Sequence, residues 1–415
     1  MAINDVDKYV ATLQKYNTNI KDEEVKAAVE KIIAEKVPEN DTPEVKKFLL
    51  GSVELTSLRT TDNEENILAM VEKVNRFDKE YPELPHVATI CTYPNFAKLV
   101  SESLEVDGVQ VVNVSGSFPS SQTFIEVKVA EASLAVKDGA TEIDIVMPVG
   151  KYLSGDYEGV ADEIGEQKQA CGECPMKVIL ETGCLPSMSD VKKASIIAMY
   201  AGADYIKTST GKEKVSATPE AAYVMCQAIK EYYDQTGIQI GLKPAGGINT
   251  VRDAVTYYAI VKEVLGEKWL TNKWFRMGTS RLTNLLISEL LGKEVKFFSE
   301  PPNPLKGALP SCKQVEWQSP SQGAVFFRGF NGYIVQNIKS FEKALQLKAL
   351  PSFGFFKIFT SSALSAPSIS SPGPNDHPKR PHPEAHSAQT TTSKRPFRKS
   401  SRAKSSPISG WKSPL

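Results

Sequence analysis

Short apolar runs rich in β-branched residues alternate with amphipathic stretches of helical periodicity from about residue 51 to residue 292. The predicted strands are residues 52–58, 86–93, 109–115, 142–148, 176–182, 205–210, 238–243 and 274–278. The predicted helices between them centre near residues 70, 99, 130, 163, 195, 227, 257 and 286. Several strands are apolar on both faces, which is typical of parallel strands covered by helices. Eight βα units of this kind predict an α/β fold, a TIM (β/α)8 barrel, with a doubly wound sheet as the alternative.

The segments on either side of this repeat differ from it. Residues 1–50 are predicted to form N-terminal helices: residues 20–50 give two short ones, broken by Pro38 and Pro43, that cover the N-terminal face of the barrel. The barrel domain is predicted to span residues 51–298. Residues 299–360 form an aromatic-rich extension without a sustained period, and residues 361–415 form a basic Ser/Pro-rich tail whose composition predicts disorder.

Charge is distributed unevenly, although the formal net charge of the 415-residue chain is zero. Residues 1–298 carry 33 basic and 44 acidic side chains, residues 299–360 carry 7 and 3, and residues 361–415 carry 9 and 2. Nucleic-acid binders normally carry a basic excess, so nucleic acid is not an expected partner of the acidic barrel. For the basic tail this possibility stays open.

The chain shows no secretory or membrane-spanning pattern. Its first residues are acidic without an apolar run, no segment approaches the length of a membrane span, and its six cysteines are too sparse for a disulfide scaffold. We therefore expect a soluble, cytoplasmic protein with no membrane partner.

Candidate chemistry lies at the carboxyl ends of the strands, where barrel enzymes place their active sites. Lys207 and Lys243 lie within apolar strands and are expected to point into the barrel mouth. Desolvation and a second cation lower the pKa of a lysine, which leaves a free amine that can form a Schiff base with a carbonyl. Asp144 on the fourth strand could then offset charge and shuttle protons. The alternative is a purely structural Lys–Asp ion-pair network in the barrel core.

Glycine-rich turns follow the last strands of the repeat. Barrels commonly bind phosphate there through backbone N–H groups and a helix N-terminus. Plain turn glycines are the alternative interpretation. The candidate phosphate-binding residues are Thr210, Gly211, Lys212, Gly246, Gly247, Gly278, Thr279 and Ser280.

Six segments, in order along the chain, resemble one known family. They are Ala88-Thr-Ile-Cys-Thr-Tyr-Pro94, Glu142-Ile-Asp-Ile-Val146, Lys177-Val-Ile-Leu-Glu-Thr-Gly183, Tyr205-Ile-Lys-Thr-Ser-Thr-Gly-Lys212, Gly241-Leu-Lys-Pro-Ala-Gly-Gly-Ile248 and Phe275-Arg-Met-Gly-Thr-Ser280. Together they are similar to deoxyribose-phosphate aldolase, a class I (metal-free) aldolase on a TIM barrel. The likeness runs from about Phe48 to Leu291.

The resemblance implies a role for each matching residue. Lys207 matches the Schiff-base lysine, Lys243 the lysine that depresses its pKa, and Asp144 the acid/base carboxylate. Thr56 and Cys91 match positions near the substrate, and the glycine-rich turns match the phosphate-binding positions. The implied reaction is the reversible cleavage of 2-deoxy-D-ribose 5-phosphate to D-glyceraldehyde 3-phosphate and acetaldehyde in deoxyribonucleotide catabolism. The sugar phosphate is then the expected small-molecule partner, with no cofactor and no metal, and a homo-oligomer is allowed.

Two departures from the family pattern bear on these expectations. The family commonly has Asp-Leu-Thr at the end of the first strand, whereas this chain has Glu54-Leu55-Thr56. The family's C-terminal tyrosine has no counterpart that can be matched. The alternative hypothesis is a relic sugar-phosphate-binding barrel whose basic tail binds nucleic acid or another partner.

Overall fold

The computed structural model describes residues 8–279 and 281–299. Eight parallel strands follow one another around a ring in the order β7-β6-β5-β4-β3-β2-β1-β8. Parallel bridges between Leu242 and Phe275 and between Ala245 and Gly278 join β7 to the β8 segment and close the ring. The predicted (β/α)8 barrel is therefore confirmed, and the doubly wound sheet is wrong because an open sheet would leave β7 and β8 as distant edges. The strands are β1 (Val53–Thr56), β2 (Thr89–Thr92), β3 (Gln110–Ser115), β4 (Glu142–Val146), β5 (Met176–Ile179), β6 (Tyr205–Lys207), β7 (Gly241–Lys243) and β8 (Met277–Thr279).

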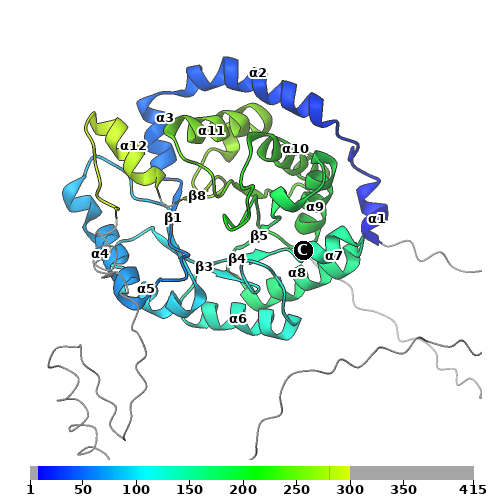
Figure 1. Cartoon of the computed structure of the whole chain (residues 1–415), viewed down its shortest axis with the longest axis horizontal. Coiled ribbons are helices and arrows are strands. Elements are labelled where there is room, and N and C mark those ends of the chain that lie inside the picture. Colours follow the sequence, from blue (N-terminus) through cyan, green and yellow to red (C-terminus); the bar gives the residue numbers. More distant parts are fainter. Residues whose placement is uncertain (1–7, 280, 300–415) are drawn as a thin grey trace, which may run out of the picture. The chain divides into compact units, whose positions relative to one another are not determined.

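Helices surround the strands as an outer ring (Figure 1). Each predicted helix is present, because a stripe of apolar side chains on it packs against the strands or the neighbouring helices. Polar caps fix several starts: Thr218 accepts a hydrogen bond from the N–H of Ala221, and Thr250 forms a reciprocal capping box with Asp253. The helices are α4 (Glu64–Glu80), α5 (Ala97–Ser103), α6 (Ile125–Lys137), α7 (Val149–Leu153), α8 (Tyr157–Cys171), α9 (Met188–Tyr200), α10 (Pro219–Thr236), α11 (Val251–Leu265) and α12 (Leu282–Leu291).

Three helices precede the barrel: α1 (Lys8–Leu13), α2 (Asp22–Asn40) and α3 (Pro43–Leu50). The prediction that Pro38 breaks a helix is wrong, because α2 continues through it. Pro38 lies in the last turn, where a single backbone hydrogen bond is lost. The helix end is secured by Asn40, whose side chain donates to the Lys36 carbonyl at 2.7 Å and accepts from Lys262 of α11 at 3.2 Å. Pro43 does begin a helix, at the first position of α3.

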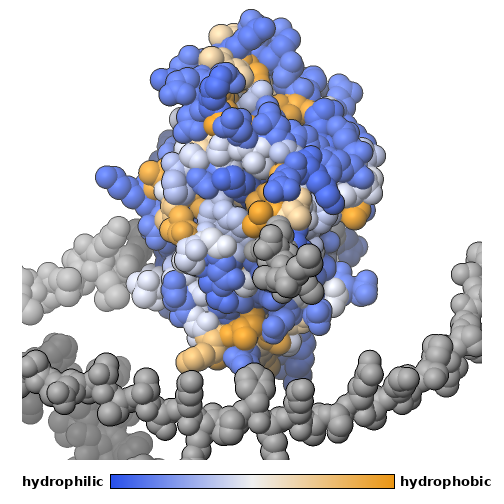
Figure 2. Space-filling view, turned by 90° about the vertical axis from the view of Figure 1, so that its right-hand side faces the viewer, coloured by the Kyte–Doolittle hydropathy of each residue, from blue (hydrophilic) through white to orange (hydrophobic). Residues whose placement is uncertain are grey.

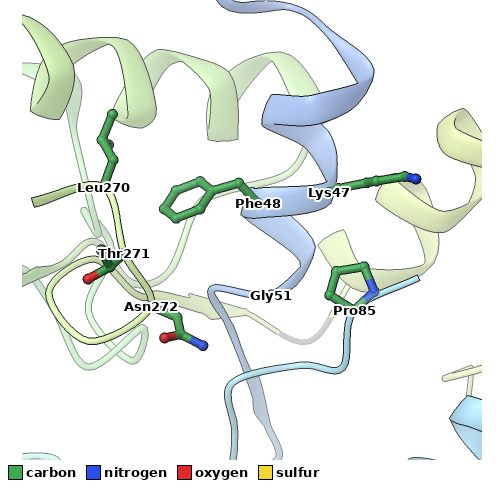
Figure 3. Close-up of a pocket in the computed structure, with 7 residues that line it drawn as sticks. All are labelled: Lys47, Phe48, Gly51, Pro85, Leu270, Thr271 and Asn272. Atoms are coloured by element: carbon green, nitrogen blue, oxygen red, sulfur yellow. The ribbon is translucent and has the colours of Figure 1, made fainter. Parts of the chain in front are cut away.

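The two longer of these helices contact the barrel domain in different places, and the covering of its N-terminal face stays a prediction. Helix α2 packs outside α10 and α11, on the ring of helices (Figure 1). Phe48 of α3 instead stacks on Phe275, with ring centroids 6.1 Å apart, close to where β8 begins. A hollow of about 540 Å³ opens beside Phe48, between segments that precede β1, β2 and β8 (Figure 3). It therefore lies at the opposite end of the strands from the predicted site.

The register of the sheet sets the polar side chains of the barrel interior. Asp144 pairs with Lys177 across β4 and β5, and Lys207 pairs with Lys243 across β6 and β7. Paired residues of neighbouring parallel strands direct their side chains to the same face, here the barrel interior. All four side chains are buried, as is Glu54 on β1. The fold thus places five charged residues from five strands around one centre.

The outer surface seen in Figure 2 is largely hydrophilic, with apolar side chains in small separate groups. None of the helices in residues 8–279 and 281–299 is long and apolar enough to cross a membrane. The predicted domain boundaries stay predictions, and the extension and tail lie outside the described residues.

Candidate active site

Asp144 forms the centre of the candidate site, and two lysines share one of its oxygens. The Lys207 Nζ lies 2.7 Å from Asp144 Oδ2, and the Lys243 Nζ lies 2.6 Å from the same atom. The three residues come from β4, β6 and β7, and the side chains are at most 4% exposed. The structure therefore brings together the three residues that the sequence predicted to carry the chemistry.

A second tier of charges lies beneath these residues. Lys177 of β5 reaches Asp144 Oδ1 at 3.1 Å and Glu142 Oε2 at 2.5 Å. Arg276, just before β8, reaches Glu142 Oε1 at 3.1 Å and Glu54 Oε1 at 3.4 Å. We call the whole set the lysine–carboxylate cluster; it consists of Glu54, Glu142, Asp144, Lys177, Lys207, Lys243 and Arg276.

Glu54 stands where the family commonly has Asp. It bonds directly to the Lys243 ammonium and is therefore part of the site. The longer side chain still delivers its carboxylate to the cluster from β1. No role was predicted for Lys177, Glu142 or Arg276. Their signal was a charged residue inside an apolar strand, the same signal that identified Lys207.

The two lysines that share Asp144 have opposite pKa shifts. Burial, reinforced by the positive charge of Lys243, lowers the pKa of Lys207 below its usual value despite the neighbouring Asp144 carboxylate. Burial also acts to lower the pKa of Lys243, but the carboxylates of Asp144 and Glu54 outweigh it and raise that pKa. Lys207 is therefore the candidate free amine, and Lys243 stays a cation beside it.

Asp144 stays ionised in this environment. Burial acts to raise its pKa, but the three surrounding lysines, Lys177, Lys207 and Lys243, hold that pKa well below the usual value. A carboxylate with two lysines on one oxygen can accept a proton from one nitrogen and return it to another. This arrangement is suited to the proton transfers of Schiff-base chemistry.

Cys91 and Thr56 lie beside the cluster at the ends of β2 and β1. Cys91 is fully buried, and burial raises the pKa of its thiol to about 11, so the thiol is neutral at physiological pH. The Cys91 sulfur and one carboxylate oxygen each of Glu54 and Asp144 all lie within 4.8 Å of one another, a spacing that could hold a metal ion. Lys243 bonds to both carboxylates of that group, so the geometry favours an ion-paired cluster over a metal site.

The candidate phosphate-binding turns after β6 and β7 touch each other at the barrel mouth. Gly211 and Gly246 both have positive φ, at 77° and 75°, and a Cβ on Gly246 would lie 3.1 Å from the Gly211 Cα. The Gly246 N–H donates to the carbonyl of Gly278 at 3.3 Å, which ties the β7 turn to β8. Gly247 follows with the same left-handed conformation, and Thr279 ends β8. Ser280 lies outside the described residues.

Glu181 orders the turn after β6. Its carboxylate accepts from the Thr210 hydroxyl at 2.5 Å and from the Thr210 N–H at 3.3 Å. The Thr210 hydroxyl in turn accepts from the Lys212 N–H at 3.1 Å. The Lys212 ammonium spans the mouth and bonds to the carbonyl of Leu58 beyond β1. Glu181 itself has a φ of 52°, a strained conformation for a residue with a Cβ, as is common in functional sites.

We expect Gly246→Ala to lower the free energy of unfolding by more than the strain of its positive φ alone would. A φ of 75° costs alanine roughly 1–2 kcal/mol, and a Cβ 2.8 Å from the Ser216 hydroxyl adds about 1–3 kcal/mol of crowding. The matched control is Gly155→Ala, where φ is 82° and a Cβ meets nothing within 4 Å. The free energy of unfolding in guanidinium measures both variants. Equal losses for the two would contradict the close approach of the turns.

A closed parallel barrel with a buried lysine of lowered pKa at its mouth and glycine-rich turns beside it is typical of Schiff-base-forming barrel proteins. The sequence model of the "DeoC/LacD family aldolase" matches residues 55–284. The chain belongs to this aldolase family.

Named relatives agree with this assignment. The chain is 39% identical over 276 residues to a Caenorhabditis elegans protein named "Putative deoxyribose-phosphate aldolase". The match covers 66% of this chain and 90% of that protein. It is 41% identical over 244 residues to the deoxyribose-phosphate aldolase of Homo sapiens, a match that covers 55% of this chain and 76% of the human protein. A solved structure from Toxoplasma gondii, titled as a "putative deoxyribose-phosphate aldolase", covers 60% of this chain and 94% of its own, with a TM-score of 0.52 at 23% identity. That structure supports the fold alone.

Proposed function

We propose that this chain is a class I deoxyribose-phosphate aldolase that reversibly cleaves 2-deoxy-D-ribose 5-phosphate to D-glyceraldehyde 3-phosphate and acetaldehyde, in deoxyribonucleotide catabolism. The observation that carries the proposal is the Lys207 amine, buried beside the Lys243 cation and 2.7 Å from Asp144. The names of its relatives support the same substrate. The predicted homo-oligomer and cytoplasmic location stay predictions.

The first step is addition of the Lys207 amine to the C1 aldehyde of the open-chain sugar. The carbinolamine that forms loses its hydroxyl as water and leaves an iminium ion. The proton released by the attacking nitrogen passes to Asp144 Oδ2, the acceptor nearest to Lys207 Nζ, and from there to the alkoxide, which becomes the carbinolamine hydroxyl. A second proton, taken up from solvent, lets this hydroxyl leave as water and gives the iminium its positive charge. Lys243 on the same oxygen keeps positive charge next to the developing alkoxide.

The second step breaks the C2–C3 bond of the sugar. The C3 hydroxyl loses its proton to the Asp144–Lys243 pair, its oxygen becomes the aldehyde of D-glyceraldehyde 3-phosphate, and the bonding electrons move into the iminium to give an enamine. The proton from the C3 hydroxyl is delivered to C2 of the enamine, and hydrolysis of the resulting iminium releases acetaldehyde, restores the Lys207 amine and returns the proton taken up from solvent in the first step. Atoms and charges balance without a redox partner.

Substrate alignment is assigned to the glycine-rich turns and Lys212. Phosphate binding at the far end of the sugar fixes C1 over Lys207 and uses remote binding energy to align the bond that breaks. The Lys212 ammonium, which bonds to the Leu58 carbonyl, is the cation that moves to the phosphate. Other backbone N–H groups of the turns after β6 and β7 supply further donors, since those of Gly246 and Gly278 already bond to the carbonyls of Gly278 and Pro244.

Borohydride trapping with acetaldehyde tests the proposed Schiff base. The expected result is one N-ethyl lysine at Lys207, located by peptide mass spectrometry, together with release of glyceraldehyde 3-phosphate from 2-deoxyribose 5-phosphate. Lys192 is the internal control, because it is equally buried but bonds to Glu231 at 2.6 Å on the helical ring. A protein that forms no adduct at Lys207 disproves the proposed function.

We expect Lys212→Met to weaken binding of the phosphorylated substrate selectively. A hydrogen bond to a charged group contributes about 1.5–3 kcal/mol, so KM for 2-deoxyribose 5-phosphate should rise roughly 10- to 150-fold. The value of kcat/KM for unphosphorylated 2-deoxyribose should stay nearly unchanged. Lys214→Met, an exposed lysine in the same loop, is the matched control and should leave both substrates unaffected. Equal losses for both sugars would assign Lys212 a structural role.

A further inference from the structure

The lysine–carboxylate cluster contains more positive than negative groups. Its carboxylates are Glu54, Glu142 and Asp144, and its cations are Lys177, Lys207, Lys243 and Arg276. No side chain among these seven is more than 7% exposed. With every group ionised the cluster carries one excess positive charge, and with Lys207 as a free amine three cations face three carboxylates.

Lys177 contacts all three carboxylates of the cluster. Its Nζ lies 2.5 Å from Glu142, 3.1 Å from Asp144 and 3.6 Å from Glu54, and the Tyr205 ring lies 5.6 Å away. It binds the Asp144 oxygen, Oδ1, that the two upper lysines do not use. Asp144 is therefore held from below while its second oxygen faces the reacting lysine.

We propose that Lys177 is a positioning residue for the Schiff-base lysine: it fixes Asp144 through Oδ1, and its charge completes a neutral cluster in which Lys207 has no proton. The inference rests on the proposed function, and it gives a role to a side chain that need not touch the substrate.

The physical reason is the cost of an unbalanced charge in a buried site. When Lys177 is replaced by an uncharged residue, only Lys243 and Arg276 remain to face three carboxylates. Protonation of Lys207 then restores balance, which removes the nucleophile at neutral pH. The other titratable groups around Lys207 do not substitute for it: Cys91 is a neutral thiol, and Glu181 adds negative charge.

The test is the pH dependence of acetaldehyde trapping at Lys207 in Lys177→Met. Removing the positive charge raises the pKa of Lys207, so the free amine emerges at higher pH. We expect the rising limb of adduct formation to move upward by at least about one pH unit, with a tenfold or greater loss at pH 7 that is recovered at alkaline pH. Because trapping uses acetaldehyde alone, the result does not depend on which sugar phosphate is cleaved.

Two further variants separate charge from orientation and from folding. Lys177→Met combined with Glu142→Gln removes one charge of each sign, so the limb should return toward its original pH while kcat stays low because Asp144 Oδ1 is unheld. Lys192→Met removes an equally buried, paired lysine outside the site and should leave the limb in place. An unshifted limb in a folded Lys177→Met protein, or a limb that the double variant does not restore, overturns the inference alone. A wild-type protein without an adduct overturns the proposed function and the inference together.

Discussion

Lys207→Ala is expected to abolish aldol cleavage, with kcat/KM reduced by a factor on the order of 10⁴ or more. The methyl group of alanine cannot form the covalent bond on which each later step depends. The fold should survive this change, because removing the proposed free amine leaves three cations and three carboxylates in the cluster. The free energy of unfolding should fall by no more than about 1–2 kcal/mol, from lost packing alone. Steady-state kinetics and guanidinium denaturation measure the two effects.

Lys207→Arg supplies the control for charge. A guanidinium keeps the positive charge at this position but stays protonated and forms no Schiff base. We expect it to be as inactive as Lys207→Ala, and less stable, because it returns one excess charge to the buried cluster. Residual activity above about one percent in either variant would show that another amine carries the chemistry.

The barrel itself could be predicted from the periodicity, whereas the ends of its strands could not. The predicted strand at residues 205–210 is only Tyr205–Lys207 in the structure. The Thr208 backbone still bonds to Lys243 and Thr182, and its hydroxyl accepts from the Ala245 N–H. Thr210 bonds to the Glu181 side chain instead, so the chain leaves the ladder after Thr208 to build the mouth. A sequence pattern registers apolar and β-branched residues, but not the partner that draws the backbone out of the sheet. The same limitation explains Pro38, which tertiary contacts keep inside a helix.

The candidate site could be predicted only at its upper tier. Lys207, Lys243 and Asp144 stand out because they lie near strand ends in apolar surroundings. Lys177 lies at the start of β5, and nothing in the sequence says that it pairs with Asp144. That contact depends on the stagger between neighbouring strands, which brings the start of one strand beside the middle of the next. The tier that balances the charges thus emerges only from the register of the closed barrel.

Asp144→Asn should be the most damaging single substitution for activity and stability together. The carboxylate is buried and within 3.1 Å of three lysine nitrogens, so an amide leaves the ammonium groups of Lys177 and Lys243 without their shared partner. Breaking a buried ion pair costs about 3–5 kcal/mol. Loss of the proton acceptor should lower kcat about 10²- to 10⁴-fold. Thermal or guanidinium unfolding and steady-state kinetics on the full chain give both values.

The difference in free energy of unfolding between the wild-type protein and Asp144→Asn should depend on pH in a defined direction. Burial acts to raise the folded-state pKa of Asp144, but contacts with three lysines outweigh it and hold that pKa well below its usual value. A carboxyl group with a depressed folded pKa stabilises the protein above its unfolded pKa, about 3.9, and loses that contribution as pH falls through the folded value. The gap in free energy of unfolding between the wild-type protein and Asp144→Asn should therefore be constant near neutral pH and narrow below about pH 4.

Glu163→Gln is the matched control that decides between chemistry and structure. Glu163 also accepts from two lysines, Lys128 at 2.6 Å and Lys151 at 2.8 Å, but it lies on α8 outside the barrel mouth. If Asp144 is part of the catalytic machinery, both substitutions lower stability while only Asp144→Asn lowers kcat. If the lysines and carboxylates form a purely structural network, kcat falls only because less protein is folded. Asp144→Asn and Glu163→Gln then lose similar activity when they are equally destabilised. Rates corrected for the folded fraction distinguish the two, because a missing proton acceptor slows every folded molecule.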